Sequence, residues 1–577
     1  TDVTLGCVGY GDGGGGCTYN MVERMRRYRK MPGMPEVKIG KVSEFYESAE
    51  KVYDELPVWD GEMYYENHRG TFTSQAFVKE NNRKGEFLLR DAELLGVLAG
   101  GYDKEEIERL WRLLLTNQFH DILPGTSIHE VFENTKKEYA ELMQRGNEIK
   151  TALLEKLSAP FADENSVVVW NLLPRAVSGA VKVRVPARFT GVKNALSSFI
   201  SSGNENIVEF IADDVPAVGC KRYYLTDEKS YKGNIASENR LENEFLRVEF
   251  AENGDIISIY DKEDGFEALS GAGNVLTISH DKSIHESAWN LENDYKLHMD
   301  VLKSAESVTI AENSPVKGVI RVVHRYNNSV ITQDITLCSG SKRLDFVTHV
   351  VWREREKVLK AQFPADIRAR YSTFNVAHGA FERPTFANNQ FETAMFECCA
   401  HKWVDLSESG RGVALLNNCK YGHDLTENLM RITLMRGPVC PDRYGDIGEQ
   451  DFIYSFYPHS GEWHSSGAIG EAEKLNQPLF AVYCETGKSK EEGRSFMSVS
   501  EDNISLEAVK TAQSGRGVII RVNETAKKHT SAAVLLPFTA SKIYECNMME
   551  EIERELPAGN ELRFDIKPFE VKTFLII

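Results

Sequence analysis

The chain has 577 residues, of which 42% are hydrophobic and 27% charged, a composition typical of globular proteins and a length that requires several domains. A formal net charge of −18 argues against nucleic acid or an anionic membrane as a partner, and no apolar run is long enough to span a bilayer. Ten cysteines without a CxxC pair indicate reduced thiols. Nothing in the sequence resembles a secretory signal, so we expect a cytoplasmic protein. The negative net charge is compatible with a neutral ligand such as a sugar.

The chain opens on a pattern that predicts a single buried strand at residues 3–8. No partner strand follows in the helical region after it, and a lone parallel strand forms no sheet. We therefore expect the chain to begin inside a domain whose larger part lies upstream, with residues 1–40 as the end of that domain.

A glycine-rich stretch follows the predicted strand and precedes a predicted helix at 19–29. Gly9, Gly11 and Gly14 satisfy the G-x-G-x-x-G pattern, so dinucleotide binding is a rival interpretation. A dinucleotide-binding unit next requires a strand ending in an acidic residue, which this chain lacks. The glycines then either present Asp12 into a ligand cleft or form a flexible turn with Asp12 in solvent.

Residues 41–158 have the periodicity of a bundle of three to four helices with short connections. Capping patterns and apolar spacing predict helices at residues 43–56, 74–98, 103–120 and 127–157. Between the first and second helices, His68 and Arg69 stand among aromatic residues that can stack on a sugar ring; taken alone they also fit an ordinary surface loop.

The third and fourth helices meet at residues 117–126, where Pro124 and Gly125 stop the helix. His120 lies away from the apolar stripe of its helix, so core packing does not explain it. An imidazole followed by Asp121 suits a metal ligand beside a substrate contact. On these two residues alone, capping of the helix end is the simpler interpretation, because one His and one Asp make no metal site.

Beyond Pro160 the pattern changes to alternating strands and turns, which predicts antiparallel β domains at 159–232, 233–476 and 477–577. Strands are expected at 181–185, 246–250 and 256–260. Adjacent Cys398 and Cys399 point to opposite strand faces, so joint zinc binding with His401 is not expected. Loop carboxylates at Asp442 and Asp446, with Glu449, are weak candidates for the border of a cleft.

Four motifs together resemble one family. GYGDGGGG at 9–16, HRGTFTSQ at 68–75, NQFHDILPGTS at 117–127 and AHKWVDLSE at 400–408 resemble, in order, the class II α-mannosidases of glycoside hydrolase family 38, closest to the bacterial and vacuolar-type cytosolic branch. The resemblance implies a multidomain α+β fold: the C-terminal remnant of an α/β barrel-like catalytic domain, a helical-bundle middle domain and a large antiparallel β-sandwich region.

The resemblance also implies roles for single residues. His120 matches the metal-ligand histidine of the family, and Asp121 matches the neighbouring aspartate that contacts the bound sugar. Asp12 falls near the acid/base carboxylate, and His68 with Arg69 falls in the segment that lines the sugar subsite. No segment matches the remaining metal ligands or the nucleophile, which belong to the upstream part of the family fold.

The activity implied is metal-dependent, retaining exo-hydrolysis of terminal α-mannosides, with one divalent cation, expected to be Zn²⁺. The partner would be a mannose-containing oligosaccharide, and homo-oligomer formation is left open. Since one histidine cannot hold the cation, the isolated chain is expected to be inactive. A non-catalytic carbohydrate-binding β-sandwich protein is the main alternative, and dinucleotide binding is a weaker one.

Overall fold

The computed structural model describes residues 3–11, 14–228, 233–283 and 286–577. The chain divides into two compact units, Thr1–Tyr64 and Tyr65–Ile577. It is a multidomain chain with few helices and many antiparallel sheets, as the sequence predicts. No helix of the described residues is long and apolar enough to cross a membrane.

The first unit holds two short helices, α1 (Tyr19–Tyr28) and α2 (Val42–Glu50), followed by the 3-10 turn η1 (Tyr53–Glu55). The single helix predicted at 43–56 is therefore shorter than expected. The strand predicted at residues 3–8 is wrong: these residues form no strand and their side chains are exposed. The physical reason is that a single strand without a neighbouring strand has no partner for its backbone N–H and C=O groups.

Described residues of the glycine stretch in the first unit are joined by backbone hydrogen bonds. Tyr10 and Gly15 exchange two backbone hydrogen bonds of 3.0 and 3.1 Å. Among the described residues of this unit no strand is present, so the geometry gives the dinucleotide-binding interpretation no support. Asp12 lies outside the described residues.

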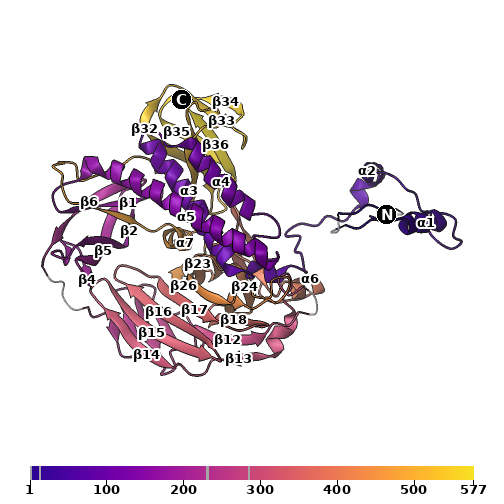
Figure 1. The fold of residues 1–577 in the computed structure, drawn as a ribbon, viewed down its shortest axis with the longest axis horizontal. Helices are drawn as coiled ribbons and strands as arrows, with labels where there is room; N and C mark the ends of the chain where they lie inside the picture. The colour runs from indigo at the N-terminus through magenta and orange to yellow at the C-terminus, as the bar shows by residue number, and fades with distance from the viewer. Residues whose placement is uncertain (1–2, 12–13, 229–232, 284–285) are drawn as a thin grey trace. The chain divides into compact units, whose positions relative to one another are not determined.

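The second unit begins with η2 (Arg69–Phe72) and then three long helices, α3 (Ala76–Leu98), α4 (Lys104–Asn117) and α5 (His129–Ser158). These helices lie side by side in Figure 1 and share one apolar core. The fully buried members of that core are Val78, Leu89, Ala92, Ile107, Leu110, Leu114, Phe132, Tyr139 and Leu142. The helices predicted at 74–98, 103–120 and 127–157 are confirmed, with ends shifted by up to three residues.

The capping patterns that predict the last two helices start at Asp103 and Ser127, and these two residues behave differently. Asp103 caps α4, because its side chain accepts a 3.1 Å hydrogen bond from the backbone N–H of Glu106. Ser127 does not cap α5, which begins at His129 after Ile128. Its hydroxyl instead donates to the backbone oxygen of Asp121 at 2.8 Å, so tertiary bonding replaces the local cap.

The rest of the second unit is built from antiparallel sheets. The first large sheet has nine strands in the order β14 (Ser307–Asn313), β15 (Lys317–Tyr326), β16 (Ser329–Cys338), β17 (Leu344–Trp352), β26 (Gly448–Ser460), β23 (Arg411–Asn417), β22 (Trp403–Glu408), β19 (Tyr371–Val376) and β20 (Gly379–Pro384). The second has six, in the order β13 (Met299–Val301), β12 (Val275–His280), β18 (Lys357–Pro364), β25 (Leu429–Arg436), β24 (Gly422–Thr426) and β21 (Cys398–Cys399).

These two sheets pack face to face through aromatic side chains. Phe346 of β17 lies 5.5 Å, between ring centroids, from Phe363 of β18, and Phe363 stacks on Phe456 of β26 at 5.3 Å. All three rings are buried. The arrangement is the sandwich that the alternating pattern predicts.

Two smaller sheets precede the sandwich. One comprises β11 (Phe266–Glu267), β10 (Ile256–Asp261), β9 (Leu246–Phe250), β8 (Arg240–Glu242) and β7 (Ala236–Ser237), and the other β2 (Val177–Pro186), β5 (Glu205–Val215) and β4 (Ser197–Ser202). The strands predicted at 181–185, 246–250 and 256–260 fall in β2, β9 and β10.

A further sheet joins distant parts of the chain: β27 (Phe480–Cys484), β1 (Ser166–Asn171), β6 (Gly219–Thr226) and β28 (Gly493–Ser495), with β3 (Gly191–Val192) beside β6. The last two sheets contain β29 (Ser498–Val499), β32 (Thr530–Ala540) and β35 (Gly559–Ile566), and β30 (Ile504–Thr511), β31 (Val518–Glu524), β36 (Val571–Ile576), β33 (Ile543–Cys546) and β34 (Ile552–Leu556).

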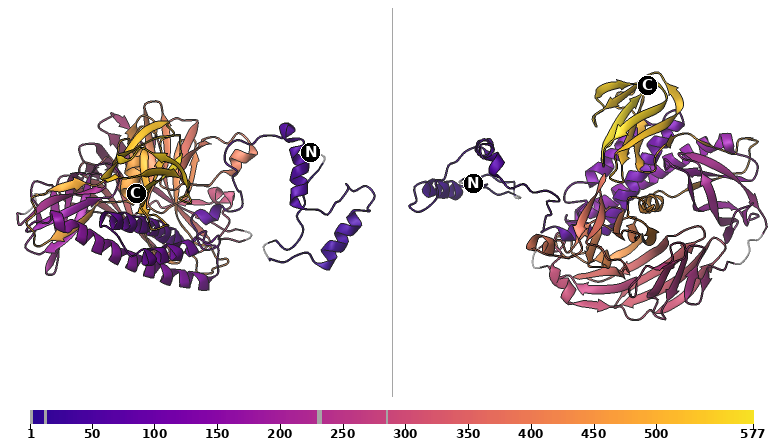
Figure 2. Two further views of the ribbon diagram at one scale, coloured as in Figure 1. Left: turned by 90° about the horizontal axis from the view of Figure 1, so that it is seen from above. Right: turned by 180° about the vertical axis from the view of Figure 1, so that it is seen from behind.

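The short remaining elements are η3 (Ala159–Phe161), η4 (Asn293–Leu297), α6 (Gln390–Ala394) and α7 (Ala468–Asn476). Figure 2 shows the C-terminal sheets, in yellow, beside the long helices. The long helices and the C-terminal sheets share a hydrophobic core, in which Leu94 and Leu95 of α3 pack with Ile504 and Leu506 of β30.

Candidate functional site

His120 and Asp121 lie in the turn that joins α4 to α5, which we call the helix corner (residues 117–126). The helix ends at Asn117, and four backbone hydrogen bonds between residues 119 and 126, including one of 3.0 Å from Gly125 N–H to Ile122 oxygen, close the turn. The side chain of His120 is 77% exposed, and its Nε2 lies 3.4 Å from Oδ2 of Asp121. The ring of Phe119, itself exposed, lies 4.2 Å from the imidazole, so the corner presents an imidazole, a carboxylate and an aromatic ring to solvent.

Local hydrogen bonds fix the carboxylate of Asp121. Its Oδ1 accepts a 2.8 Å bond from the hydroxyl of Thr126, whose backbone N–H donates to the backbone oxygen of Asp121 at 3.1 Å. The other carboxylate oxygen faces His120. Asp121 is thus held in one orientation with one oxygen available to a ligand.

The segment that contains His68 and Arg69 packs against the helix corner. At Gly125, where φ is +87°, an added Cβ would lie 2.2 Å from the backbone oxygen of Ser74. The motif at residues 68–75 thus contacts the motif at residues 117–127. The imidazole of His68 is exposed and meets the ring of Tyr65 edge to face at 4.7 Å.

Arg69 is held by the protein itself. Its Nε and Nη2 donate to the backbone oxygen of Ala394 at 3.1 and 2.7 Å, Nη1 donates to the oxygen of Glu66, and the guanidinium lies 4.1 Å from the ring centroid of Phe396. These contacts fix the loop that carries His68. Sequence reasoning had no signal for them, because Ala394 and Phe396 are more than 300 residues away along the chain.

A buried ion pair between Arg436 and Asp281 also contacts the segment of residues 68–75. Arg436 donates to both carboxylate oxygens of Asp281 at 2.7 and 2.8 Å and to the hydroxyl of Ser74 at 3.0 Å, and its side chain is 1% exposed. Gly70 lies against this arginine, and its N–H donates to the backbone oxygen of Trp289 at 2.7 Å. The pair therefore connects β25, the loop near residue 289 and the loop before α3.

The carboxylates of Asp442 and Asp446 are buried and bind the start of α3. Both oxygens of Asp446 accept backbone N–H groups, those of Gln75 at 2.8 Å and Ala76 at 2.7 Å. Asp442 accepts the side-chain amide of Gln75 at 2.8 Å and lies 3.2 Å from Nδ1 of His129. Burial raises the pKa of Asp446. These residues act as a helix cap supplied from another domain rather than as the border of a cleft.

The residues that the structure describes do not complete a metal centre. Among them, no group of three or more His, Cys, Asp or Glu side chains is arranged to hold a metal ion. His120 and Asp121 offer two donors, whereas zinc in proteins takes at least three. Burial is the main cause that lowers the pKa of His401 to about 3. That the Cys-Cys-x-His segment binds no zinc stays a prediction from the sequence.

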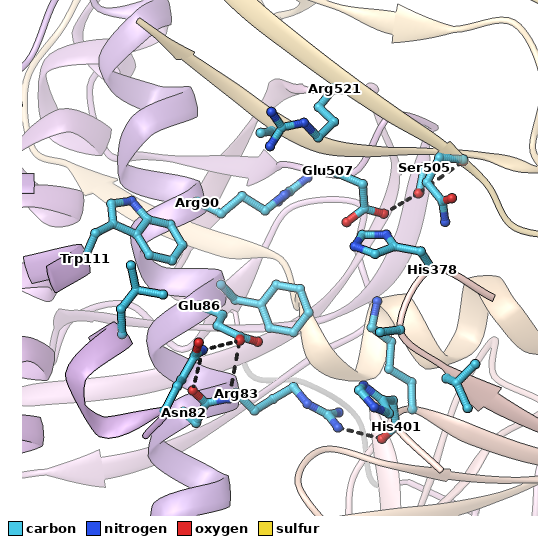
Figure 3. Close-up of a pocket in the computed structure, with 18 of the residues that line it drawn as sticks. Asn82, Arg83, Glu86, Arg90, Trp111, His378, His401, Ser505, Glu507 and Arg521 are labelled. Carbon is cyan, nitrogen blue, oxygen red and sulfur yellow. Dashed lines mark hydrogen bonds between the residues drawn. The ribbon is translucent and has the colours of Figure 1, made fainter. Parts of the chain in front are cut away.

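Behind the corner, a cavity of about 930 Å³ separates α3 and α4 from the sheets. Figure 3 shows its lining: Glu86 and Trp111 come from the helices, and His378 and Glu507 from the sheets opposite. Gln118 and Pro124 line it as well, so its near end lies directly behind the helix corner. Trp111, a member of the apolar stripe of α4, is half-buried, packs against the helix core and lines this cavity.

Glu93, also in the cavity wall, should make stability depend on pH. Burial raises its pKa from 4.5 to about 7, against the opposing effects of Lys510, Trp111 and Tyr102. The folded state therefore keeps the proton longer than the unfolded state, and stability is lost as pH rises from 4.5 through 7. We expect Glu93→Gln, which cannot ionise, to gain about 2–3 kcal/mol relative to the wild type between pH 5 and pH 8.

Urea unfolding at the two pH values measures this difference. The exposed Glu561→Gln on β35 is the control, and its difference from the wild type should stay constant. A Glu93→Gln difference that is the same at both pH values would contradict the raised pKa.

Comparison with known proteins places this arrangement in a family. Residues 1–62 match the glycosyl hydrolases family 38 N-terminal domain, 66–157 the alpha mannosidase middle domain, 241–444 the family 38 C-terminal domain and 503–574 the family 38 C-terminal beta sandwich domain. These domains belong to one class of glycosyl hydrolases. The chain belongs to glycoside hydrolase family 38.

Individual relatives agree. The human protein "Alpha-mannosidase 2C1" is 30% identical over 589 residues, covering 99% of this chain and 55% of the relative. "Alpha-mannosidase G" of Dictyostelium discoideum is 29% identical over 627 residues, covering 99% and 57%. The crystal structure of an alpha-mannosidase from Enterococcus faecalis V583 shares the fold, with a TM-score of 0.75, 16% identity, and coverage of 98% of this chain and 75% of that one. The chain spans about half the length of the curated relatives it matches.

Proposed function

We propose that this chain is part of a retaining, metal-dependent exo-α-mannosidase that removes terminal α-mannosides from oligosaccharides. The observation that carries the proposal is the helix corner, where an exposed imidazole and an orientated carboxylate lie together in a chain of this family. Relatives named as α-mannosidases across 99% of the chain support the substrate class.

In this proposal the residues of the corner bind and orient the sugar. Asp121, fixed by Thr126, accepts a hydrogen bond from a sugar hydroxyl. Phe119 offers an apolar face beside it. His68, at the tip of the neighbouring loop, lines the same subsite, and Arg69 holds that loop against Ala394.

His120 supplies one nitrogen donor to a divalent cation, for which zinc suits a mixed imidazole and carboxylate set. Such an ion provides Lewis-acid stabilisation to a bound sugar. The described residues do not hold it alone, so the other donors and the nucleophile lie outside them. Asp12 is the proposed acid/base carboxylate of the two-carboxylate mechanism. The cytoplasmic location and a homo-oligomer stay predictions from the sequence.

Activity on an aryl α-mannoside tests the proposal. The product of the complete gene should hydrolyse the substrate, the 577-residue chain alone should not, and His120→Ala in the complete protein should lower kcat/KM by more than about 100-fold. Asp121→Asn should lower it by about 10–100-fold through the lost charged hydrogen bond.

The matched control is His464→Ala, another exposed imidazole beside a carboxylate, which should leave kcat/KM unchanged. Hydrolysis by the 577-residue chain alone, or wild-type activity in His120→Ala, would contradict the role of the corner. A complete protein that binds mannosides and hydrolyses none would favour a non-catalytic carbohydrate-binding protein.

A further inference from the structure

The cavity behind α3 and α4 has the size of a ligand site. Its volume of about 930 Å³ lies near the upper end of the range for small-molecule sites, about 300–1,000 Å³. Its walls come from three parts of the second compact unit, namely the helices, the nine-stranded sheet and the C-terminal sheet that contains β30. Ligand pockets form preferentially at such junctions between domains.

The arginines of this cavity build its walls and are not left to bind an anion. Arg83 donates to the phenol of Tyr421 at 2.9 Å, to Asn476 at 3.0 Å and to the backbone oxygen of His401 at 2.6 Å. Arg90 donates twice to the backbone oxygen of Leu506, at 3.2 and 2.7 Å. These two guanidinium groups thereby connect α3 to other parts of the unit. The third arginine of the lining, Arg521, donates to the hydroxyl of Thr573 at 3.0 Å and to the backbone oxygen of Met548 at 3.3 Å.

Two carboxylates in the walls keep acceptor capacity. Glu86 receives amide donors from Asn82 at 3.3 Å and Gln118 at 2.9 Å, both on Oε1. Glu507 receives the hydroxyl of Ser505, likewise on Oε1. Within the described part of the chain, the hydrogen bonds of each carboxylate thus use one oxygen. Since a carboxylate offers about four acceptor positions, the second oxygens suit the hydroxyl groups of a ligand.

The charge of Glu507 is maintained inside the wall. Burial opposes its ionisation, but Lys402, the hydrogen bond from Ser505, His378 and Arg90 together outweigh burial and lower its pKa. Figure 3 shows the side chains of Glu507 and His378 next to each other, with Glu86 on the opposite, helical side. A ligand between them therefore meets acceptors from two directions, with Lys402, His378 and Arg90 close to Glu507. Two further cations of the lining bond to the protein itself, Lys104 to the backbone oxygens of Ala512 and Gln513 and Lys510 to Glu550. Because acidic and basic side chains are both present, the lining suits a neutral ligand better than an ion of one sign.

Aromatic rings provide the remaining surface. Trp111 of α4 and Phe87 of α3, both half-buried, line the cavity. Trp111 also packs against the apolar core of the three helices. The ring faces suit apolar C–H groups, whereas an entirely apolar ligand would bury the wall carboxylates without a partner, at a cost of about 1–3 kcal/mol each. A molecule with hydroxyl groups and an apolar face satisfies both surfaces.

We propose that this cavity is a second carbohydrate site, which binds a neutral saccharide between Trp111 and the carboxylates of Glu86 and Glu507. The site goes beyond the proposed hydrolysis, because it needs neither the cation nor the nucleophile. Every residue that forms it belongs to the described second unit.

Isothermal titration calorimetry with a linear α-linked mannotriose tests the site. The protein is used as the His120→Ala variant, which keeps the trisaccharide intact and disables the corner. We expect binding in this background, and a Kd about 10-fold or more weaker after adding Glu86→Gln or Glu507→Gln, since each replaces a carboxyl acceptor by an amide of nearly the same shape. Adding Glu561→Gln, on the exposed face of β35, should leave the Kd unchanged.

A Trp111→Phe variant, which keeps a ring but loses the indole, should weaken binding and reduce saturation transfer from the protein to the sugar protons in NMR. Binding that is absent in His120→Ala but present in the wild type would place the saccharide at the corner and overturn the proposal. Binding unchanged in both Gln variants, or tighter binding of glucuronate than of mannotriose, would overturn it as well. Loss of hydrolysis in His120→Ala is a separate readout, so the two proposals fail separately.

Discussion

Replacing Arg436 with methionine should lower the free energy of unfolding by about 3–5 kcal/mol, because Asp281 is left charged, buried and without its partner. The loss extends to the loop before α3, since the hydroxyl of Ser74 also loses its donor. Urea unfolding followed by circular dichroism measures the change. A loss of less than about 1 kcal/mol would contradict a buried ion pair at this position.

The double variant Arg436→Met with Asp281→Leu separates the charge from the packing. Removing both members of a buried pair is far less costly than removing one, so at least about half of the lost stability should return. As a control, Arg321→Met breaks the exposed pair with Asp334 and should cost less than about 1 kcal/mol.

Gly125→Ala should be the most damaging small substitution at the helix corner. The new Cβ would lie 2.2 Å from the oxygen and 2.6 Å from the carbon of the Ser74 carbonyl, and the backbone at φ +87° disfavours any side chain. Left-handed strain of about 1–2 kcal/mol and overpacking of about 1–3 kcal/mol together predict a loss of about 2–5 kcal/mol. Since the shift moves Asp121, kcat/KM of the complete protein should fall too.

Gly203→Ala is the matched control for the backbone strain. Gly203 has φ +67° in the turn between β4 and β5, and nothing lies within 4 Å of its added Cβ. Its substitution should cost only about 1–2 kcal/mol and leave activity unchanged. Equal losses of unfolding free energy in the two variants would show that the close contact between Ser74 and the helix corner adds nothing to the cost of Gly125→Ala.

The sequence was sufficient for elements whose signals are local. Ile107, Leu110 and Leu114 repeat at helical spacing, and all three are buried on one face of α4. Pro124 and Gly125 indicated the turn after that helix. His120 is exposed as predicted, but it lies in the turn beyond Asn117 and not on the helix. These predictions hold because caps, turns and apolar stripes act within a few residues.

Features set by distant contacts were beyond reach of the same reasoning. Ser127 carries a capping pattern, yet its hydroxyl bonds to Asp121. Asp446 reads as a loop carboxylate, and only the fold shows that it caps α3, which is about 370 positions earlier in the chain. Trp111 belongs to the apolar stripe of α4, yet its side chain lines the cavity between the helices and the sheets. No local sequence pattern indicates that cavity.

The pairing of β1 with β27 has a consequence for biosynthesis. Residues 166–171 are all buried in a sheet between β6 and β27, and β27 comprises residues 480–484. While the chain is still being made, the neighbour on one side of β1 does not yet exist, and an apolar strand edge stays open until the ribosome has passed residue 484. Most of the sandwich must therefore be synthesised before this earlier sheet can close, so the order of folding differs from the order of translation.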